Sequence, residues 1–259
     1  MLKYLFIFLF PLSVKSQDSL KKYSYLIYQI GKDSTIHTGT GAFVKVGHKV
    51  YFLSSKHVFG GFDSDAKKKL NYPDTLYILL KDKKTGTRTK YLVDIKKYKR
   101  LTIPTYNFES PDYVSFLIKN PEHYEINSIE KFISNEVVVD SAISYIVGFG
   151  YLQKKVNKPE DIFQFEPLQF SGTTNGEYSF KMYHKKYDKV DSINYYAYPT
   201  NYLDLRGASG SSIFQVLKSG KILFGGIYTA SNPEEKIYLF VRPNFILNSI
   251  KRKSMLVNF

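Results

Sequence analysis

Short runs of apolar and aromatic residues, separated by turn residues, recur along the whole chain. Such runs, rich in Val, Ile, Tyr and Phe and about four to eight residues long, are typical of β-strands. In the first half of the chain we expect strands at Tyr23–Ile30, Gly41–Val46, Val50–Leu53, Thr75–Leu80, Arg88–Ile95 and Val114–Ile118. In the second half we expect strands at Ile143–Gly148, Phe163–Phe170, Tyr178–Tyr183, Ser211–Val216, Ile222–Thr229 and Ile237–Val241.

A sustained helical period occurs only near the end of the chain. Pro243–Arg252 begins with proline and ends in basic residues, and both features are typical of helix ends. Between the two sets of strands, residues 120–135 are polar and contain Pro121, so we expect a linker there. The pattern therefore predicts an all-β chain in two halves with one C-terminal helix.

Candidate chemistry is concentrated in Gly207–Ser211, a Gly-Ala-Ser-Gly-Ser segment that places Ser209 between two glycines. Every histidine precedes this segment: His37, His48, His57, His123 and His184. A lipase-type nucleophile elbow has a glycine at its fifth position and its catalytic histidine downstream. Ser211 stands at the fifth position here, so both the residue and the order exclude such an elbow. The remaining common order of a catalytic triad is His, Asp, Ser.

Two strand ends supply the other candidate members of a triad. His57 follows the apolar run Tyr51–Leu53 and a short Ser-Ser-Lys segment, and Asp112 precedes the strand expected at Val114–Ile118. A serine hydroxyl needs a neutral imidazole to remove its proton, and a carboxylate holds that imidazole in the required tautomer. His57, Asp112 and Ser209 are therefore the candidate base, orienting carboxylate and nucleophile.

Gly207 supplies a second feature of the candidate nucleophile segment. A glycine two residues before the serine lets the backbone turn sharply. The amides of Gly207 and Ser209 are then expected to point at one position, where the negatively charged oxygen of a tetrahedral intermediate would form. Ser211 and Ser212 are expected to pack or hydrogen-bond within the strand that follows.

Other assignments stay open at this point. Asp94 and Asp74 are alternatives for the carboxylate, although neither is followed by so clear a buried strand. A subtilisin-like order needs an aspartate before the histidine, which Asp33 supplies, and an α/β chain, which this pattern does not predict. Each residue alone also has an ordinary structural role, as part of a glycine-rich loop, a hydrogen-bonding histidine or a turn aspartate.

Taken in chain order, these residues resemble the chymotrypsin-like serine peptidases, and the bacterial trypsin-like branch more than the digestive enzymes. The resemblance covers most of residues 23–252. Its pieces are Gly39–Val44, Ser55–Val58, Asp112 before its strand, Gly207–Gly210, Leu223–Thr229, and Ile237–Val241 followed by Pro243–Lys251. Several pieces in the right order are far more specific than any one of them.

Four positions depart from the family's pattern. Ser55 replaces the usual alanine before the histidine, and Ser211 and Ser212 replace a frequent second glycine and a frequent proline. Ala208 stands where digestive relatives carry an aspartate that pairs with a newly cut N-terminus, so activation by that ion pair is not expected. The three triad positions remain filled.

The resemblance implies a fold and a function. The fold is two six-stranded antiparallel β-barrels packed with the active site between them, plus a C-terminal helix. We expect the N-terminal barrel, with His57 and Asp112, at residues 17–120, a linker at 121–135, and the C-terminal barrel, with Ser209 and the helix, at 136–259. The implied function is a serine endopeptidase that hydrolyses protein or peptide substrates through an acyl-enzyme intermediate, without a metal or cofactor.

The same resemblance implies a substrate pocket lined by Leu203, Asp204, Tyr228, Thr229 and Lys236. Asp204 at the base of the pocket would favour a basic substrate side chain, whereas Lys236 would favour an acidic one. Leu203 or Tyr228 could instead fill the pocket, and Asp204 could form an ion pair with Arg206. The sequence therefore leaves cleavage specificity open.

The first sixteen residues have the form of a secretory signal peptide. Met1–Lys3 is short and positive, Tyr4–Val14 is mostly apolar, and Ser16 ends a suitable cleavage site, so Gln17 would be the first mature residue. The apolar run is shorter than the roughly twenty residues that a membrane span needs. We therefore expect a secreted or periplasmic bacterial protein with no transmembrane segment after signal removal.

Composition excludes several other classes of protein. The chain has no cysteine, which excludes a disulfide framework, a lipoprotein anchor and a cysteine-ligated zinc site. The histidines lack His-Glu-x-x-His spacing, so a metallopeptidase is not supported. The formal net charge is +14, but only five of the 37 basic residues are arginine and no nucleic-acid-binding motif accompanies the lysine clusters. Nucleic acid is therefore not an expected partner, and the oligomeric state stays open.

Two other functions remain as alternatives. A catalytically inactive or conditionally active relative would bind peptides or protein partners in the same cleft, since a fold can persist after its chemistry is lost. A basic surface module would bind anionic polysaccharide or nucleic acid through its lysine clusters. Such binding would weaken steeply as the salt concentration rises.

Overall fold

Strand β6 (Thr75–Asp82) shows how alternating residues build the first sheet. Leu76, Ile78 and Leu80 are buried, whereas the residues between them are partly exposed. Because successive side chains of a strand point to opposite faces, this alternation places one face of the sheet on a core. Strand β1 (Tyr25–Ile30) is buried along almost its whole length, because Tyr25 and Ile27 pack in one apolar cluster and Leu26 and Tyr28 pack in another.

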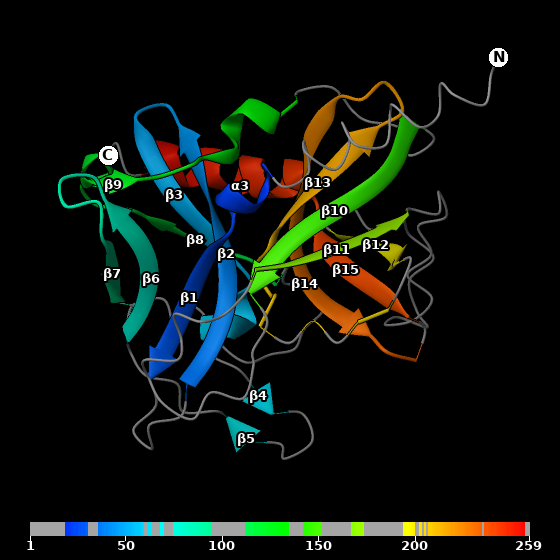
Figure 1. Ribbon diagram of the computed structural model, residues 1–259, viewed down its shortest axis with the longest axis horizontal. Helices are drawn as coiled ribbons and strands as arrows, with labels where there is room; N and C mark the ends of the chain where they lie inside the picture. Colours follow the sequence, from blue (N-terminus) through cyan, green and yellow to red (C-terminus); the bar gives the residue numbers. More distant parts are fainter. Residues whose placement is uncertain are drawn as a thin grey trace.

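The described part of the chain in this computed structural model contains two antiparallel β units and a C-terminal helix (Figure 1). The structure describes residues 19–30, 36–59, 62–63, 68–69, 75–94, 112–134, 142–151, 167–173, 194–199, 202–203, 205, 207–234 and 236–256. The predicted signal peptide, Asp204 and the strand expected at Tyr178–Tyr183 lie outside these residues.

The first unit is a curled sheet with the strand order β7-β6-β1-β2-β3-β8, and β9 pairs with β6. The remaining strands of this sheet are β2 (Ile36–Val46), β3 (Lys49–Ser54), β7 (Arg88–Asp94), β8 (Val114–Leu117) and β9 (Tyr124–Glu125). The short 3₁₀ helix η3 (Lys56–Phe59) follows β3, and a small hairpin of β4 (Phe62–Asp63) and β5 (Lys68–Lys69) lies beyond it.

The second unit is a closed six-stranded barrel with the order β10-β11-β12-β15-β14-β13. Its strands are β10 (Ile143–Tyr151), β11 (Pro167–Thr173), β12 (Asn194–Pro199), β13 (Ser212–Leu217), β14 (Ile222–Asn232) and β15 (Ile237–Val241). The predictions for β15 and for the starts of β10 and β14 agree with the structure. Strand β12 is not predicted by the residue pattern.

The expectation of a closed six-stranded barrel is confirmed for the second unit, and the described strands of the first unit form a curled sheet. Within the described residues, β7 and β8 end the first sheet without pairing with each other. A side chain spans part of this opening, because the amide of Lys119, just after β8, donates a hydrogen bond of 2.9 Å to the hydroxyl of Tyr91 in β7. Strand β8 has only four residues and forms a short ladder with β3.

The segment predicted as a linker is packed against the fold. Its 3₁₀ helices η4 (Pro121–His123) and η5 (Ile129–Phe132) flank β9, and Ile129 is fully buried. Ser128 forms a parallel bridge with Phe43 of β2. Residues 121–134 therefore belong to the body of the protein and help to cover the junction between its two halves.

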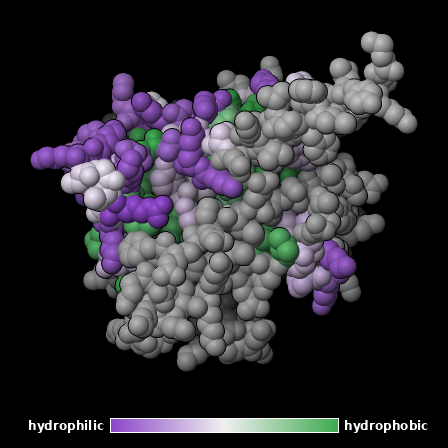
Figure 2. All heavy atoms as spheres, in the orientation of Figure 1, coloured by the Kyte–Doolittle hydropathy of each residue, from purple (hydrophilic) through white to green (hydrophobic). Residues whose placement is uncertain are grey.

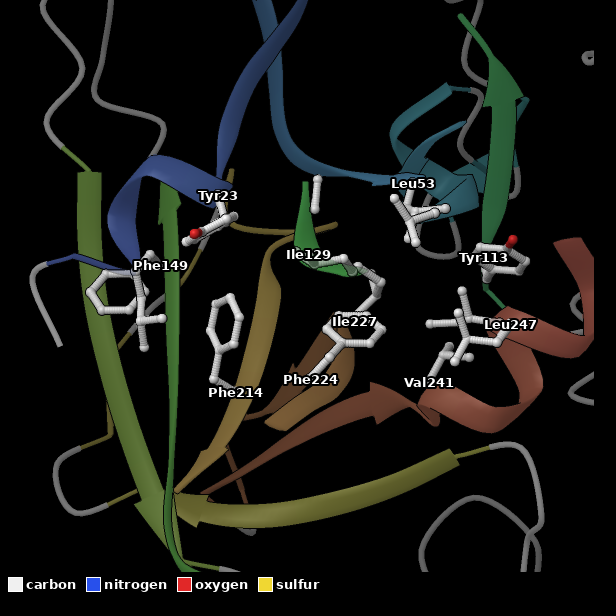
Figure 3. Packing of buried hydrophobic residues seen from close by; sticks show 14 of the residues in the cluster. Tyr23, Leu53, Tyr113, Ile129, Phe149, Phe214, Phe224, Ile227, Val241 and Leu247 are labelled. Atoms are coloured by element: carbon white, nitrogen blue, oxygen red, sulfur yellow. The ribbon is translucent and has the colours of Figure 1, made fainter. Parts of the chain in front are cut away.

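One apolar cluster joins the two units (Figure 3). Strands β2 and β3 of the first sheet contribute Ala42, Val44, Tyr51 and Leu53, and the barrel contributes Val147, Phe149, Phe214, Phe224, Ile227 and Val241. The ring of Tyr23 packs edge-on against Phe132 and Phe214, with ring centroids 5.0 and 6.1 Å apart. Burial of this shared cluster is the main reason why the halves stay together.

Helix α3 (Pro243–Leu256) packs against this shared cluster, and Figure 3 shows Leu247 of the helix among the cluster residues. Proline is favoured at the first position of a helix because the missing N–H has no intrahelical acceptor there. Ile246, Leu247 and Ile250 form one apolar stripe and are buried in the shared cluster, while Lys251 and Arg252 are exposed. The predicted helix is confirmed, and it extends four residues past Arg252.

Leu53 and Leu92 give a matched test of this core. Leu53 lies in the shared cluster with no exposed surface, and Leu92 is 58% exposed on β7. We predict that Leu53→Ala lowers the free energy of unfolding by about 2–5 kcal/mol, because it leaves a cavity among side chains of both halves. Leu92→Ala should change it by less than about 0.5 kcal/mol. Urea denaturation measures both values, and equal effects would contradict the proposed core.

Candidate active site

His57 and Asp112 are joined by two hydrogen bonds. His57 lies in η3 directly after β3, and Asp112 lies just before β8, which pairs with β3. The ring Nδ1–H of His57 donates to Oδ2 of Asp112 at 2.6 Å, and the backbone amide of His57 donates to Oδ1 at 2.9 Å. Both side chains are a little over one third exposed. This arrangement fixes the ring and leaves Nε2 as the ring nitrogen that is not bonded to Asp112.

The charges of this pair shift both pKa values. Burial lowers the pKa of His57, but the negative charge and hydrogen bond of Asp112 outweigh burial and hold the pKa above its ordinary value of 6.5. Burial raises the pKa of Asp112, but the positive charge of His57 and hydrogen bonds from the His57 ring and amide lower it further than burial raises it. The pair therefore favours a charged carboxylate beside a more basic imidazole.

The nucleophile loop, defined as Gly207–Ser211, is a tight turn that leads into β13. Gly207 and Gly210 have φ values of +89° and +92°, a region that glycine adopts easily and other residues rarely adopt. A Cβ atom at Gly210 would collide with the carbonyl oxygen of Thr40 and with Oγ of Ser54. Both glycines are therefore required by the backbone path around Ser209.

This loop is docked on the first sheet by hydrogen bonds that cross between the units. The amide of Thr40 donates to the carbonyl of Ser209 at 2.8 Å, and its hydroxyl donates to the carbonyl of Gly207 at 3.1 Å. Two residues before His57, the hydroxyl of Ser55 donates to the carbonyl of Tyr228 at 2.9 Å. The amide of Gly210 donates to that same carbonyl at 2.8 Å. His57 and Ser209 are thus both within two residues of one contact between the units.

The hydroxyl of Ser209 is directed at a backbone carbonyl in this structure. Its Oγ donates to the carbonyl of Thr229 at 3.4 Å, and within the described residues it forms no hydrogen bond with the His57 ring. Hydrogen bonds between a catalytic serine and its base are often long or misaligned without substrate and shorten in the complex. A small rotation about the Cα–Cβ bond of Ser209 changes the direction of this hydroxyl.

Two amides of the loop are left without a backbone acceptor among the described residues. The amides of Ala208, Gly210 and Ser211 donate to backbone carbonyls, whereas those of Gly207 and Ser209 donate to none. The two unpaired amides are the pair that the sequence predicts for an oxyanion site. Converging backbone N–H groups are a common way to stabilise a negatively charged oxygen.

Ser211 and Ser212, which depart from the family's pattern, are both fully buried and hydrogen-bonded. The Ser211 hydroxyl donates to the carbonyl of Ala208 inside the loop. A Cβ atom at Gly150 would collide with this hydroxyl, so a glycine is needed on β10. The Ser212 hydroxyl, in β13, lies 3.2 Å from the Ser24 hydroxyl and 3.4 Å from the carbonyl of Tyr23. Neither serine is exposed enough to compete with Ser209 as the nucleophile.

The residues predicted to line the pocket lie in different environments. Leu203 is 43% exposed, and its amide donates to the hydroxyl of Tyr238 at 3.0 Å. Tyr228 is buried, with its ring 5.8 Å from Tyr238 and 6.0 Å from Phe240. Thr229 is buried, and its hydroxyl donates a hydrogen bond to the carbonyl of Leu239. Lys236 is exposed in the turn between β14 and β15, with a φ of +53°. Tyr228 therefore fills the barrel, and Asp204 lies outside the described residues.

Other candidates from the sequence lie elsewhere. Asp94 ends β7, and Asp74 lies outside the described residues. Lys81 pairs with Glu125 at 2.9 Å, and the Asp82 carboxylate accepts the amides of Lys84 and Thr85, so the lysine cluster at Lys81–Lys84 lies in an ordinary solvated hairpin. Figure 2 shows hydrophilic side chains over this end of the first sheet, where β6, β7 and β9 lie.

Neither a metal site nor a membrane-spanning helix is found among the described residues. Their His, Asp and Glu side chains form no group of three or more that could hold a metal ion. Their helices are too short and too polar to cross a bilayer.

Thr40, Ser54 and Ser55 are site residues that the sequence analysis misses as such. Across the junction, the Thr40 hydroxyl donates to Gly207 of the nucleophile loop and the Ser55 hydroxyl donates to Tyr228 of β14, whereas the Ser54 hydroxyl donates to the carbonyl of Thr40 within the first sheet. In the sequence, Thr40 is part of the segment Gly39–Val44 and Ser55 is a departure from the family's pattern before His57, and neither position carries a local signal of this role. Their partners are 167 and 173 residues away in the chain, so no local pattern could reveal them.

No protein-family model matches the sequence, and no curated protein matches it. Solved structures do match the fold. A serine endoprotease from Yersinia pestis is 13% identical with a TM-score of 0.51, over 90% of this chain and 62% of that chain. The chain thus spans less than two thirds of the Yersinia protein.

Two further structures match over almost their whole length. HL collagenase is 13% identical, with a TM-score of 0.53 over 91% of this chain and 94% of that chain. A scabies mite inactivated protease paralogue is also 13% identical, with a TM-score of 0.51 over 90% and 96% of the two chains. At this identity the likeness concerns the fold alone. The fold is that of the chymotrypsin-like serine proteases, which include both active and inactivated members.

The His57–Asp112 pair gives a test that does not depend on any activity. We predict that the His57 pKa lies above 6.5 and falls below 6.5 in Asp112→Asn, because burial, which lowers it, is then no longer opposed by a negative charge. Titration of the imidazole signals by NMR measures both values, and a His57→Gln variant identifies the His57 signal. A pKa that does not change in Asp112→Asn would contradict the pairing.

Proposed function

We propose that the protein is a serine endopeptidase in which Ser209 is the nucleophile, His57 the general base and Asp112 the carboxylate that orients His57. The observation that carries this proposal is the doubly hydrogen-bonded His57–Asp112 pair, which lies at the same junction as the docked nucleophile loop. The fold that the chain shares with the chymotrypsin-like serine proteases supports the proposal. We assign the three residues from their order in the chain and their positions in the structure.

The first chemical step follows from these positions. Ser209 Oγ attacks the carbonyl carbon of a peptide bond while Nε2 of neutral His57 takes its proton. Asp112 accepts the Nδ1–H of His57, so the correct tautomer is held and the imidazolium that forms is stabilised. The amides of Gly207 and Ser209, which have no backbone acceptor within the described residues, donate to the oxyanion.

The second half of the reaction reverses these roles. The imidazolium of His57 gives its proton to the leaving amine, and an acyl group remains on Ser209. Water, deprotonated by His57, then releases the acid product. Because neutral His57 is the reactive form, the rate should rise with pH through the His57 pKa, which Asp112 holds above its ordinary value.

The substrates in this proposal are proteins or peptides, and Leu203 and Thr229 are the described residues best placed to meet a substrate. Leu203 is exposed beside the barrel, and the Thr229 carbonyl lies 3.4 Å from Ser209 Oγ. Tyr228 is buried, and its backbone amide and carbonyl are already hydrogen-bonded to Ser211, Gly210 and Ser55, so it supports the site and does not meet the substrate. Specificity for a basic or an acidic side chain depends on Asp204 and Lys236.

A second candidate function is a conditionally active or inactive relative that binds peptides in the same cleft. The observation that favours it is the Ser209 hydroxyl, which is bonded to Thr229 and not to His57. Rotation of Ser209 on substrate binding would make the protein active, and a fixed hydroxyl would leave a binding protein. Reactivity of Ser209 separates the two.

We also propose that the protein is exported to the periplasm or the outside of a bacterial cell after removal of residues 1–16. The short positive segment, the apolar run and the small residue Ser16 support this route.

Labelling with a fluorophosphonate probe tests the triad. We predict that the parent reacts and that Ser209→Ala does not. His57→Ala should react at least roughly 10⁴-fold more slowly, because the serine loses its base. Ser219→Ala, a serine-to-alanine change in the exposed turn between β13 and β14, is the matched control and should react like the parent. A folded parent that is not labelled would contradict hydrolysis and favour the binding protein.

N-terminal sequencing of protein recovered from the periplasm or medium of an expressing bacterium tests export. We predict that the mature chain begins at Gln17, because Ser16 occupies the position before cleavage. Replacing Leu9 by Arg interrupts the apolar run and should keep the protein inside the cell. Export that does not depend on this run, or an intact Met1 on the exported protein, would contradict the signal peptide.

A further inference from the structure

We propose that Thr40 is a positioning residue whose hydroxyl holds the nucleophile loop in the conformation that Ser209 requires. The catalytic consequence of this inference rests on the serine peptidase function proposed above. Thr40 lies in β2 of the first sheet and has no exposed surface. It reaches the loop from the opposite half of the molecule, so it acts on Ser209 through the backbone and not by touching a substrate.

Thr40 binds the loop on both sides of Ala208. Its amide donates to the carbonyl of Ser209 at 2.8 Å, and its Oγ1 donates to the carbonyl of Gly207 at 3.1 Å. The first bond uses the backbone, so any residue at position 40 could form it. The second bond needs a hydroxyl, and it is this bond that makes threonine specific here.

The hydroxyl of Thr40 forms two hydrogen bonds, one as acceptor and one as donor. It accepts the amide of Tyr151, at the end of β10, at 2.9 Å, so its single proton is left for Gly207. The carbonyl of Thr40 accepts the buried Ser54 hydroxyl at 2.7 Å. Thr40 is therefore fully hydrogen-bonded at a fixed position, and it holds Gly207 to β2 and β10 together.

Gly207 is the residue of the loop that most needs such a restraint. Its φ of +89° is one of several conformations open to glycine at similar energy, so the local chain alone does not select it. Rotation at Gly207 would turn the two amides proposed for the oxyanion site away from each other. A bond to its carbonyl fixes the peptide plane between Gly207 and Ala208 and thereby keeps the loop in one conformation.

The same strand supplies a matched control at Thr38. The Thr38 hydroxyl is also buried, two residues before Thr40, but it has no hydrogen-bond partner among the residues that the structure describes. Thr38→Val and Thr40→Val therefore make the same chemical change in the same strand. Only the second removes a hydrogen bond to the nucleophile loop, and valine keeps the backbone amide that binds Ser209.

The experiment compares the parent with Thr40→Val, Thr40→Ser and Thr38→Val. We expect Thr40→Val to lower the rate constant for fluorophosphonate labelling by about 10- to 100-fold, somewhat less than the loss of one oxyanion donor. Thr40→Ser restores the hydroxyl and should stay within about threefold of the parent, as should Thr38→Val. The pH midpoint of labelling should not move in Thr40→Val, because the His57–Asp112 pair is untouched.

Hydrogen exchange gives a readout that is independent of chemistry. In Thr40→Val, amides of the nucleophile loop should exchange about tenfold faster than in the parent, whereas Thr38→Val should leave them unchanged. If the parent itself is not labelled, the proposed function fails and this measurement alone decides the role of Thr40. Faster exchange confined to Thr40→Val supports the positioning role, and equal exchange in both valine variants overturns it.

Two labelling outcomes also overturn the proposal. One is a Thr40→Val protein that reacts like the parent, and the other is an equal loss in Thr38→Val, which would reflect damage to the strand. If Thr40→Val does not fold, Thr40→Ser and Thr40→Ala are compared, since they differ only in the hydroxyl. Equal labelling of Thr40→Ser and Thr40→Ala would then overturn the positioning role of the Thr40 hydroxyl.

Discussion

The docking of the nucleophile loop on the first sheet is the contact on which the candidate site depends. His57 and Asp112 lie beside strands β3 and β8 of the first sheet, and Ser209 lies just before strand β13 of the barrel, so neither half contains all three candidate residues. Hydrogen bonds from Thr40 to Gly207 and Ser209 hold the nucleophile loop of the barrel against the first sheet. Each such bond contributes only about 1 kcal/mol, so the shared apolar cluster supplies the stability and the polar bonds supply the geometry.

Small residues make this close approach possible. Glycines at 150 and 210 leave room for Ser211, Thr40 and Ser54, where any side chain would collide. The buried serines near these glycines are small, and their hydroxyls donate hydrogen bonds to backbone carbonyls. These hydrogen bonds matter because a buried polar group without a partner destabilises the fold. The junction is therefore polar and tightly packed near the site, whereas the cluster beneath it is apolar.

The sequence predicts the parts of this structure that have a local signal. Alternation and β-branched residues locate β6 and β15, and proline followed by an apolar stripe locates α3. Whether β7 pairs with β8 has no such signal, because that pairing depends on contacts between residues far apart in the chain, and the two strands are not paired within the described residues. The candidate triad is found through glycine spacing and residue order, whereas the hydroxyl of Thr40 acts on a partner 167 residues away and is visible only in three dimensions.

A crystal structure of the fluorophosphonate-treated protein would show which residue reacts and which amides face the oxyanion. We predict phosphorus bonded to Ser209 Oγ, with one phosphoryl oxygen about 2.7–3.1 Å from the amides of Gly207 and Ser209. The His57 ring should remain bonded to Asp112, with its Nε2 facing the adduct. An adduct on another residue, or an oxygen directed away from both amides, would contradict the assignment of the site.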